Sequence, residues 1–191
     1  MARRALCARR NGGGLREAGK FSRRWHNRGV DATHITLHFA ERDEAATLAA
    51  MSRDLIETGL GWQYQAKRIR ELFADPNAVT LVARSGATVA GFAVMTFGDE
   101  HAHLVLLAVR PVYQRHGIAR RLIKWLIESA ATAGIVSIHV ELRASNQAAY
   151  RLYRSLEFAE TLRLPGYYRG RETAIRMLRL LRTRAVVARE K

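Results

Sequence analysis

The 191-residue chain has little sulfur, only three prolines and no long apolar run. Its one cysteine, Cys7, excludes an intrachain disulfide and a cysteine-based metal site, and fits a reducing, cytoplasmic location. No apolar stretch approaches the roughly 18–20 residues that a membrane span requires, so we expect no membrane partner. With 48% hydrophobic and 26% charged residues, the composition is typical of a globular protein with one domain and flanking tails.

Acidic residues are also few, 17 against 32 Lys and Arg, which leaves a net charge of +15. Residues 1–30 hold nine basic residues and one acid, Glu17, so this segment alone carries +8. We expect it to be a disordered basic tail, followed by a domain over residues 31–183 and a second basic tail over 184–191. The first tail could be a mitochondrial transit peptide, an arm that contacts nucleic acid or the ribosome, or dispensable sequence from an early start codon.

Hydrophobic periodicity predicts alternating strands and helices with no internal repeat and no second domain boundary. The expected strands cover residues 33–40, 79–84, 89–97, 103–109, 136–143, 158–164 and 173–180. The expected helices cover residues 43–60, 65–74, 117–133 and 146–156, and a tight segment at 165–170 separates the last two strands.

Residues 114–122 combine a donor-rich turn with the start of a helix. Gly117 and Ala119 stand where larger side chains would block a close approach. Backbone amides at the first turn of a helix bind anions such as a pyrophosphate, and Arg115 and Arg120 add positive charge. The spacing matches neither the P-loop nor the Gly-rich dinucleotide fingerprint. The alternative is a glycine-capped amphipathic helix after a solvated basic turn.

Residues 140–158 predict a strand followed by a helix with polar groups on one face. Asn146 stands at the start of this helix and Tyr153 seven residues later. At about 3.6 residues per turn and about 1.5 Å rise per residue, the two share a face roughly 10 Å apart, so both can line one groove. Asn146 is also a favoured helix cap, which would explain it without a ligand.

The order Gln114-x-x-Gly117-x-Ala119 resembles the acetyl-CoA motif of the GNAT N-acetyltransferase superfamily. Within that superfamily the chain is most similar to the bacterial ribosomal-protein N-terminal (alanine) acetyltransferases. The similarity covers about residues 31–181 and is strong only over 104–178. It rests on Glu141–Asn146, Leu152-Tyr153, Tyr167-Tyr168 and Gly170-Arg171-Glu172.

The resemblance implies an α/β (α+β) fold, the GNAT fold. Its central mixed, mostly antiparallel sheet has about seven strands, splays between the fourth and fifth strands, and is flanked by about four helices. It also implies an enzyme, monomeric or homodimeric, that needs no metal and transfers acetyl from acetyl-CoA directly to a primary amine, such as a protein N-terminal α-amine. The alternatives are a small-molecule acetyltransferase for a polyamine, amino acid or xenobiotic amine, and a non-catalytic acyl-CoA-binding module.

The resemblance also assigns residues to the acetyl-CoA site. The backbone of the fourth strand would pair with the pantetheine arm, the turn and helix start would hold the pyrophosphate, and Asn146 would both cap its helix and face the arm. The expected acetyl-CoA residues are Leu107, Val109, Gln114, Arg115, His116, Gly117, Ile118, Ala119, Arg120 and Asn146.

Two residues are expected to be catalytic by the same resemblance. Glu141 would serve as the base, directly or through water, and Tyr153 as the acid for the departing thiolate, because a carboxylate can accept a proton and a phenol can donate one. If the two residues are not catalytic, Glu141 could instead pair with Arg143 or His139, and Tyr153 could be an aromatic residue packed in the core.

The acceptor amine is expected between two loops. Trp62, Tyr64, Tyr167 and Tyr168 could wall a narrow slot, or they could pack on their own loops. His101 and His103 lack the carboxylates of a metal site, so no metal is expected. Glu157 replaces the glycine that the family carries before Phe158, which questions the turn geometry there.

Overall fold

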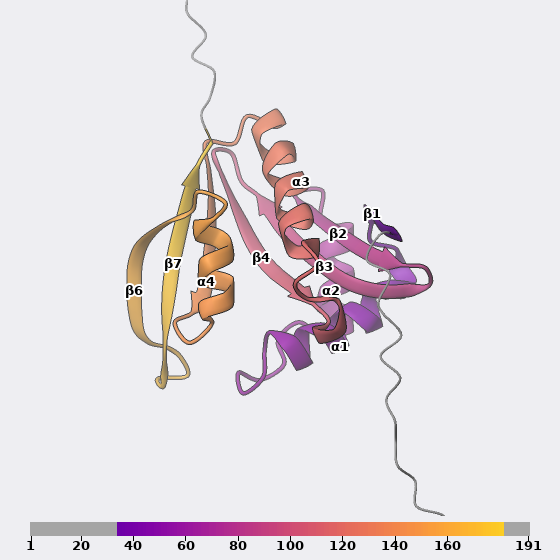
Figure 1. Cartoon of the computed structure of the whole chain (residues 1–191), viewed down its shortest axis with the longest axis horizontal. Coiled ribbons are helices and arrows are strands. Elements are labelled where there is room, and N and C mark those ends of the chain that lie inside the picture. The colour runs from indigo at the N-terminus through magenta and orange to yellow at the C-terminus, as the bar shows by residue number, and fades with distance from the viewer. Residues whose placement is uncertain (1–33, 182–191) are drawn as a thin grey trace, which may run out of the picture.

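The computed structural model describes residues 34–181, which form a seven-stranded mixed sheet with helices on both faces (Figure 1). The strand order is β1-β2-β3-β4-β5-β7-β6, antiparallel throughout except for the parallel pair β4–β5. The strands are β1 (Ile35–Phe39), β2 (Ala78–Ser85), β3 (Thr88–Phe97), β4 (His101–Val109), β5 (Ser137–Arg143), β6 (Ala159–Tyr168) and β7 (Glu172–Leu180). This confirms the expected mixed, mostly antiparallel sheet.

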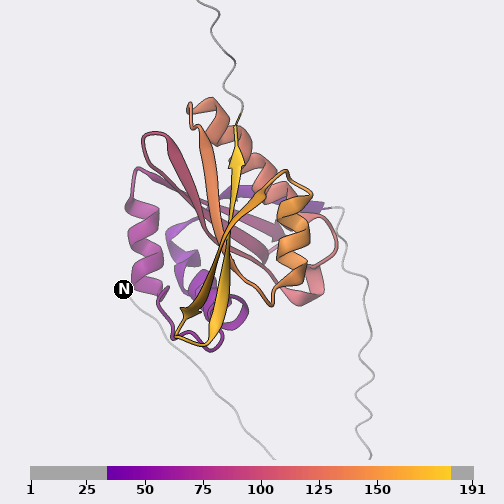
Figure 2. The same ribbon diagram turned by 90° about the vertical axis from the view of Figure 1, so that its left-hand side faces the viewer.

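Four α-helices and two short 3₁₀ helices accompany the sheet. They are η2 (Arg42–Glu44), α1 (Ala45–Leu55), α2 (Ala66–Ala74), η3 (Pro111–Tyr113), α3 (Ile118–Thr132) and α4 (Gln147–Arg154). Figure 2 shows α3 and α4 on one side of the sheet and α1 and α2 on the other. Within residues 34–181, no helix has the length and apolarity to cross a bilayer.

Two separate clusters of buried residues form the core, one on each face of the sheet. Leu122 and Leu126 of α3 belong to the first cluster, together with Ile138 of β5. Leu48 of α1 and Ile69 of α2 belong to the second. These helix residues lie on the apolar stripes that the sequence periodicity predicts.

Strand β4 parts from β5 halfway along its length. The two strands pair only from His101 to Leu104, whereas β4 stays paired with β3 as far as Val109 (Figure 1). On the side of β5, residues 105–109 of β4 therefore border an opening instead of a neighbouring strand. The expected splay between the fourth and fifth strands is confirmed.

A bulge at Val105 coincides with this parting. Met95 of β3 pairs with Leu104 and Val94 pairs with Leu106, so Val105 is an extra residue on β4. A bulge reverses the alternation of side chains between the two faces of a sheet. Leu106 is accordingly buried against α1 and α2, while Leu107 turns toward the side of α3 and α4.

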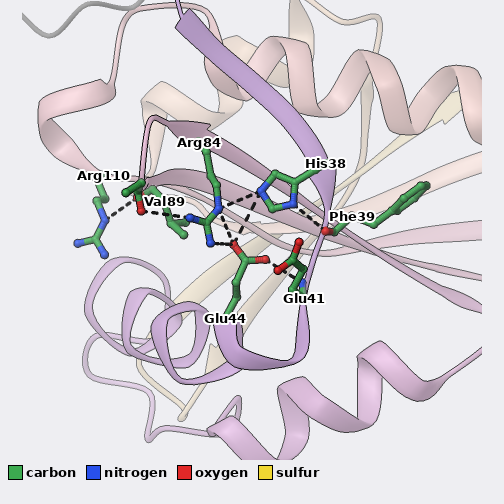
Figure 3. Close-up of polar contacts among 8 residues, drawn as sticks. His38, Phe39, Glu41, Glu44, Arg84, Val89 and Arg110 are labelled. Carbon is green, nitrogen blue, oxygen red and sulfur yellow. Dashed lines mark hydrogen bonds and ion pairs between the residues drawn. The ribbon is translucent and has the colours of Figure 1, made fainter.

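Polar contacts hold the first elements and the end of β4 in place (Figure 3). Arg84 of β2 donates from Nη2 and Nε to the buried carboxylate of Glu44, at 2.7 and 3.0 Å. Arg110, the residue after β4, donates from Nε to the carbonyl oxygen of Val89 at 2.8 Å. The chain that leaves β4 is thereby anchored to β3.

Two predicted boundaries were wrong. The first helix ends at Leu55, because Gly59 and Gly61 adopt left-handed conformations that end helical structure. The strand β6 continues to Tyr168 through most of the segment expected to be a tight turn, with a register shift after Leu164 that accommodates Pro165. The predictions for residues 1–30 and 184–191 lie outside the described residues.

Candidate functional site

A cavity of about 610 Å³ lies on the α3 and α4 side of the opening between β4 and β5. All of the expected acetyl-CoA residues line it except His116, whose Nδ1 lies 2.7 Å from the carbonyl oxygen of Gln114. The lining residues are Leu107, Val109, Tyr113, Gln114, Arg115, Gly117, Ile118, Ala119, Arg120, Asn146, Ala148, Ala149, Arg151, Leu152 and Ser155. The structure thus brings the two sequence segments together.

The turn before α3 presents backbone amides to this cavity. Arg115 and Gly117 have φ angles of 67° and 77°, which turn the chain sharply into the helix. The first backbone hydrogen bond of the helix runs from Arg121 N to Gly117 O at 3.0 Å, so the amides of residues 117–120 precede the repeating helical bonds and can bind a ligand. Gln114 Nε2 donates to Val109 O at 2.9 Å and holds the turn on β4.

Arginines give this cavity its charge. Arg115, Arg120 and Arg151 line it, and Arg120 also donates to Ser155 Oγ at 2.7 Å, which links α3 to the end of α4. Positive side chains beside a helix N-terminus suit a pyrophosphate, and the unpaired edge of β4 suits a chain of amides. The residues present therefore fit acetyl-CoA.

Asn146 both caps a helix and lines the cavity. Its Oδ1 accepts a hydrogen bond from Ala149 N at 3.0 Å, which satisfies one of the free amides of α4. The cap orients the start of α4 toward the opening in the sheet. The two interpretations left open by the sequence are both compatible with this geometry.

A second cavity, of about 460 Å³, lies on the opposite face of β4. Three of the aromatics expected to bind the acceptor line it, namely Tyr64, Tyr167 and Tyr168. Trp62 does not, because its Nε1 donates to Ala49 O at 3.2 Å and its ring packs under Arg53. The other lining residues are Ile56, Glu57, Leu60, Gln63, His103, Leu104, Val105, Leu106, Glu141 and Arg169.

Glu141 reaches this second cavity from β5. One carboxylate oxygen lies 3.0 Å from His103 Nε2, and the other accepts from Arg176 Nε and Nη2 at 2.9 and 2.8 Å. Neither Arg143 nor His139 is its hydrogen-bond partner. Sequence reasoning missed His103 and Arg176 as partners, because only the pairing of β5 with β4 and β7 places them beside Glu141.

Tyr153 of α4 is buried and lines neither cavity. Its side chain is 4% exposed and packs edge-to-face on Phe158, with 5.4 Å between the ring centroids. Burial raises the pKa of Tyr153, and the nearby phenol of Tyr168 raises it further. The phenol therefore keeps its proton at neutral pH.

Tyr168 connects the walls of the second cavity. Burial, followed by the phenol of Tyr167, raises its pKa to about 12, and the guanidinium of Arg143 lies 5.5 Å from its ring centroid. Arg143 also donates to Glu172 at 2.9 Å and to Thr58 O at 2.6 Å. One arginine of β5 thus joins the loop after α1 to the β6–β7 hairpin.

Glu57 is a further residue that the sequence did not reveal. Its buried carboxylate accepts from Ser52 Oγ at 3.0 Å and from the backbone amides of Gln63 and Tyr64 at 2.7 and 3.2 Å. These bonds shape the loop that carries Tyr64. A single acid within the predicted helix 43–60 is typical of an exposed helix position, so no sequence signal could have identified it. Among the described residues no group of three or more His, Cys, Asp or Glu could hold a metal.

Comparison with known proteins agrees with this geometry. Residues 48–158 match the family model described as Acetyltransferase (GNAT) family. The chain is 33% identical over 146 residues to the N-alpha-acetyltransferase RimI of Mycobacterium tuberculosis, which covers 73% of this chain and 88% of the relative.

Two enterobacterial proteins are also similar. The chain is 41% identical over 92 residues to the [Ribosomal protein bS18]-alanine N-acetyltransferase of Salmonella typhimurium, which covers 47% of this chain and 62%, less than two thirds, of the relative. The crystal structure of the ribosomal-protein-S18-alanine N-acetyltransferase from Escherichia coli superposes with a TM-score of 0.69 at 26% identity, over 80% of this chain and 98% of that one. The chain belongs to the acetyltransferase (GNAT) family.

Proposed function

We propose that this protein is an N-acetyltransferase that transfers acetyl from acetyl-CoA to a primary amine at the N-terminus of a protein or peptide. The observation that carries the proposal is the pair of cavities on the two faces of β4. Leu107 lines the cavity with the free amides and arginines, and its neighbour Leu106 lines the cavity with Glu141. A donor on one face and an acceptor on the other would meet at the opening in the sheet.

The first cavity offers groups that would hold acetyl-CoA, the acetyl donor. The amides of residues 117–120 and the side chains of Arg115 and Arg120 would hold the pyrophosphate, while the free edge of β4 near Leu107 and Val109 would pair with the pantetheine amides. Bound acetyl-CoA supplies the thioester carbonyl that is attacked and the thiolate that leaves.

The acceptor side would hold a cation that must lose a proton. Tyr64, Tyr167 and Tyr168 wall the second cavity, and the carboxylate of Glu141 favours an ammonium group there. We propose that the group formed by Glu141 and its neighbours removes the proton from the amine. An amine at the end of a peptide fits an open slot between two loops. By their names, one relative acetylates an alanine of ribosomal protein bS18 and another is an N-alpha-acetyltransferase.

The proton for the thiolate would come from Tyr153. Because burial raises the pKa of Tyr153, the phenol is protonated at neutral pH and has a hydrogen to donate to the thiolate. Tyr153→Phe should lower kcat about ten- to a hundredfold and leave the Kd of acetyl-CoA unchanged. Tyr150→Phe, on the same helix, is the matched control. A wild-type kcat in the Tyr153 variant at saturating substrates would remove it as the acid.

The proposal is tested with the full chain, acetyl-CoA and a panel of acceptors. The panel contains peptides that differ in their first residue, polyamines and free amino acids, and release of CoA thiol is the readout. Thiol release with peptides, and acetylation of their α-amine by mass spectrometry, is the expected result. Release only with small amines would favour a small-molecule acetyltransferase. Calorimetric binding of acetyl-CoA without release for any acceptor would indicate a non-catalytic acyl-CoA-binding module.

A further inference from the structure

Both oxygens of the Glu141 carboxylate are engaged by neighbours within the protein. Arg176 binds one oxygen through two nitrogens, at 2.9 and 2.8 Å, and His103 Nε2 lies 3.0 Å from the other. The carboxylate side chain is 17% exposed, whereas the imidazole is 43% exposed and lines the acceptor cavity. An amine that enters the cavity meets His103 with less obstruction than Glu141.

The contact with Glu141 also orients the imidazole. Nε2 lies within ion-pair distance of a carboxylate oxygen, which can only accept a hydrogen, so a neutral imidazole that turns its N–H toward Glu141 keeps a lone pair on Nδ1. Among the residues that the structure describes, Nδ1 of His103 has no hydrogen-bond partner. In catalytic triads, likewise, a carboxylate holds one nitrogen of the imidazole and the other nitrogen takes the proton.

We propose that His103 is the group that takes the proton from the acceptor ammonium, and that Glu141 positions it and stabilises its charged form. This inference rests on the proposed function and names the base within it. His103 Nδ1 accepts one proton from R–NH₃⁺ and leaves R–NH₂, whose nitrogen lone pair forms the new bond to the acetyl carbon. The imidazolium later returns this proton to solvent. The C–S bond of the thioester breaks as the new bond forms, the phenol of Tyr153 gives its proton to the departing thiolate, and the second proton lost by the nitrogen restores the phenol.

The two histidines nearest His103 on the sheet already have a polar partner. On the sheet, His139 lies opposite His103 in register, and a hydroxyl, Ser137 Oγ, bridges it to His101 at 3.0 and 2.8 Å. Neither of these histidines lines the acceptor cavity.

Charged and phenolic groups also face the cavity from the other elements. Arg176 of β7 pairs with Glu141, and Glu57 is saturated by its own loop. Arg169 lines the cavity from the β6–β7 turn, and Tyr64, Tyr167 and Tyr168 present phenols to it. This leaves His103 as the one imidazole among the described residues that line this cavity, and imidazole is the side chain best suited to exchange protons near neutral pH.

The first test is the pH profile of kcat/KM for the full chain with its best acceptor. In wild type, kcat/KM should decrease at acidic pH, which gives the profile an acidic limb. His103→Gln should lose this limb, and its kcat/KM should fall by about a hundredfold or more. Glu141→Gln should keep the limb, and its kcat/KM should fall by about tenfold. His101→Gln lies on the same face of the same strand and should stay within about threefold of wild type. The reverse pattern, with the limb lost in Glu141→Gln and kept in His103→Gln, would make Glu141 itself the acceptor of the proton.

The second test does not depend on activity. NMR of the free protein follows the titration of each imidazole, and the His103 signal is identified as the one missing in His103→Gln. Its midpoint should agree with that of the kcat/KM limb within about 0.3 pH unit, and both should move together in Glu141→Gln, because the kcat/KM profile reports ionisations of the free enzyme. Midpoints that differ by more than about one pH unit would overturn the inference.

The outcomes separate this inference from the function on which it rests. If wild type releases no thiol with any acceptor, the proposed function fails and this inference fails with it. If wild type is active but His103→Gln retains its rate and its acidic limb, only the inference about His103 fails.

Discussion

Leu104 and Leu106 are two residues apart on β4, yet their side chains are buried in different halves of the core. Leu104 packs with the cluster on the α3 side and Leu106 with the cluster on the α1 and α2 side. In a regular strand both would point the same way. The bulge at Val105 separates them, and it directs Leu106 to the cavity of about 460 Å³ and Leu107 to the cavity of about 610 Å³.

Gly117→Val should abolish measurable acetyl-CoA binding, raising the Kd by at least about a hundredfold. Gly117 has a φ of 77°, where a β-branched residue is strained, and an added side chain would stand where the anion binds. Gly134→Val is the matched control, since Gly134 has a φ of 80° at the other end of α3 and lines neither cavity.

Both glycine variants should lose about 1–2 kcal/mol of unfolding free energy, which is what the left-handed backbone costs a residue with a Cβ. The loss should not be larger, because neither added Cβ meets another atom within 4 Å. Only the first should lose acetyl-CoA in calorimetry. Equal binding by the two variants would place the pyrophosphate elsewhere.

Arg143→Lys should raise the KM of the acceptor about tenfold while the Kd of acetyl-CoA stays the same. The guanidinium joins Glu172, the carbonyl of Thr58 and the ring of Tyr168, and one ammonium group cannot reproduce this planar fork. Steady-state kinetics and calorimetry measure the two quantities. Arg163→Lys changes an exposed ion pair within β6 and should leave both unchanged. Equal weakening of both substrates would show that Arg143 supports the fold in general.

Stability should fall as the pH drops below about 6.5, in part through His139. Burial lowers the pKa of His139 in the folded protein, and His101, His103 and Arg176 lower it further. Between the lowered folded pKa and the ordinary value, the unfolded chain binds more protons, so acidification favours unfolding.

Urea unfolding at about pH 7.5 and about pH 5.5 measures this loss. The loss should be smaller in His139→Gln than in wild type. His116→Gln, at an exposed histidine, should leave it unchanged. An equal loss in wild type and His139→Gln would contradict the assignment.

Glu157→Gly should raise the free energy of unfolding by about 0.5–1 kcal/mol. Glu157 has a φ of 66°, so the turn before Phe158 keeps the left-handed conformation that suits the glycine of the family. Glycine relieves this strain at the cost of the ion pair with Arg179, and because the Glu157 carboxylate is 80% exposed, solvent screening limits what that pair contributes. Glu157→Gln loses the ion pair and keeps the strain, so chemical denaturation should find it less stable than the glycine variant. A glycine variant that is the weaker of the two would refute the strain argument.

Much of the fold was predictable because its signals are local. The period of apolar residues identified the helices and strands within a few residues, and the turn at Gly117 and the cap at Asn146 depend only on neighbouring backbone. The two boundaries that failed have different causes. After Leu55 the left-handed glycines Gly59 and Gly61 were present in the sequence but their effect was underestimated, whereas at Pro165 strand pairing decides whether the segment continues.

The sequence by itself determined where a glycine-bearing turn leads into a helix, which residues share a helix face, and that the chain resembles an acetyltransferase; the anion site at that turn stays a prediction. Only the tertiary structure decided that Val105 is a bulge, that Trp62 packs on α1 while Tyr64 lines a cavity, and that Glu141 lies between His103 and Arg176. The physical reason is the separation along the sequence of the residues that interact. Helix faces and turns follow from residues a few positions apart, whereas contacts between strands separated by more than thirty residues depend on strand order and register, which no local pattern encodes.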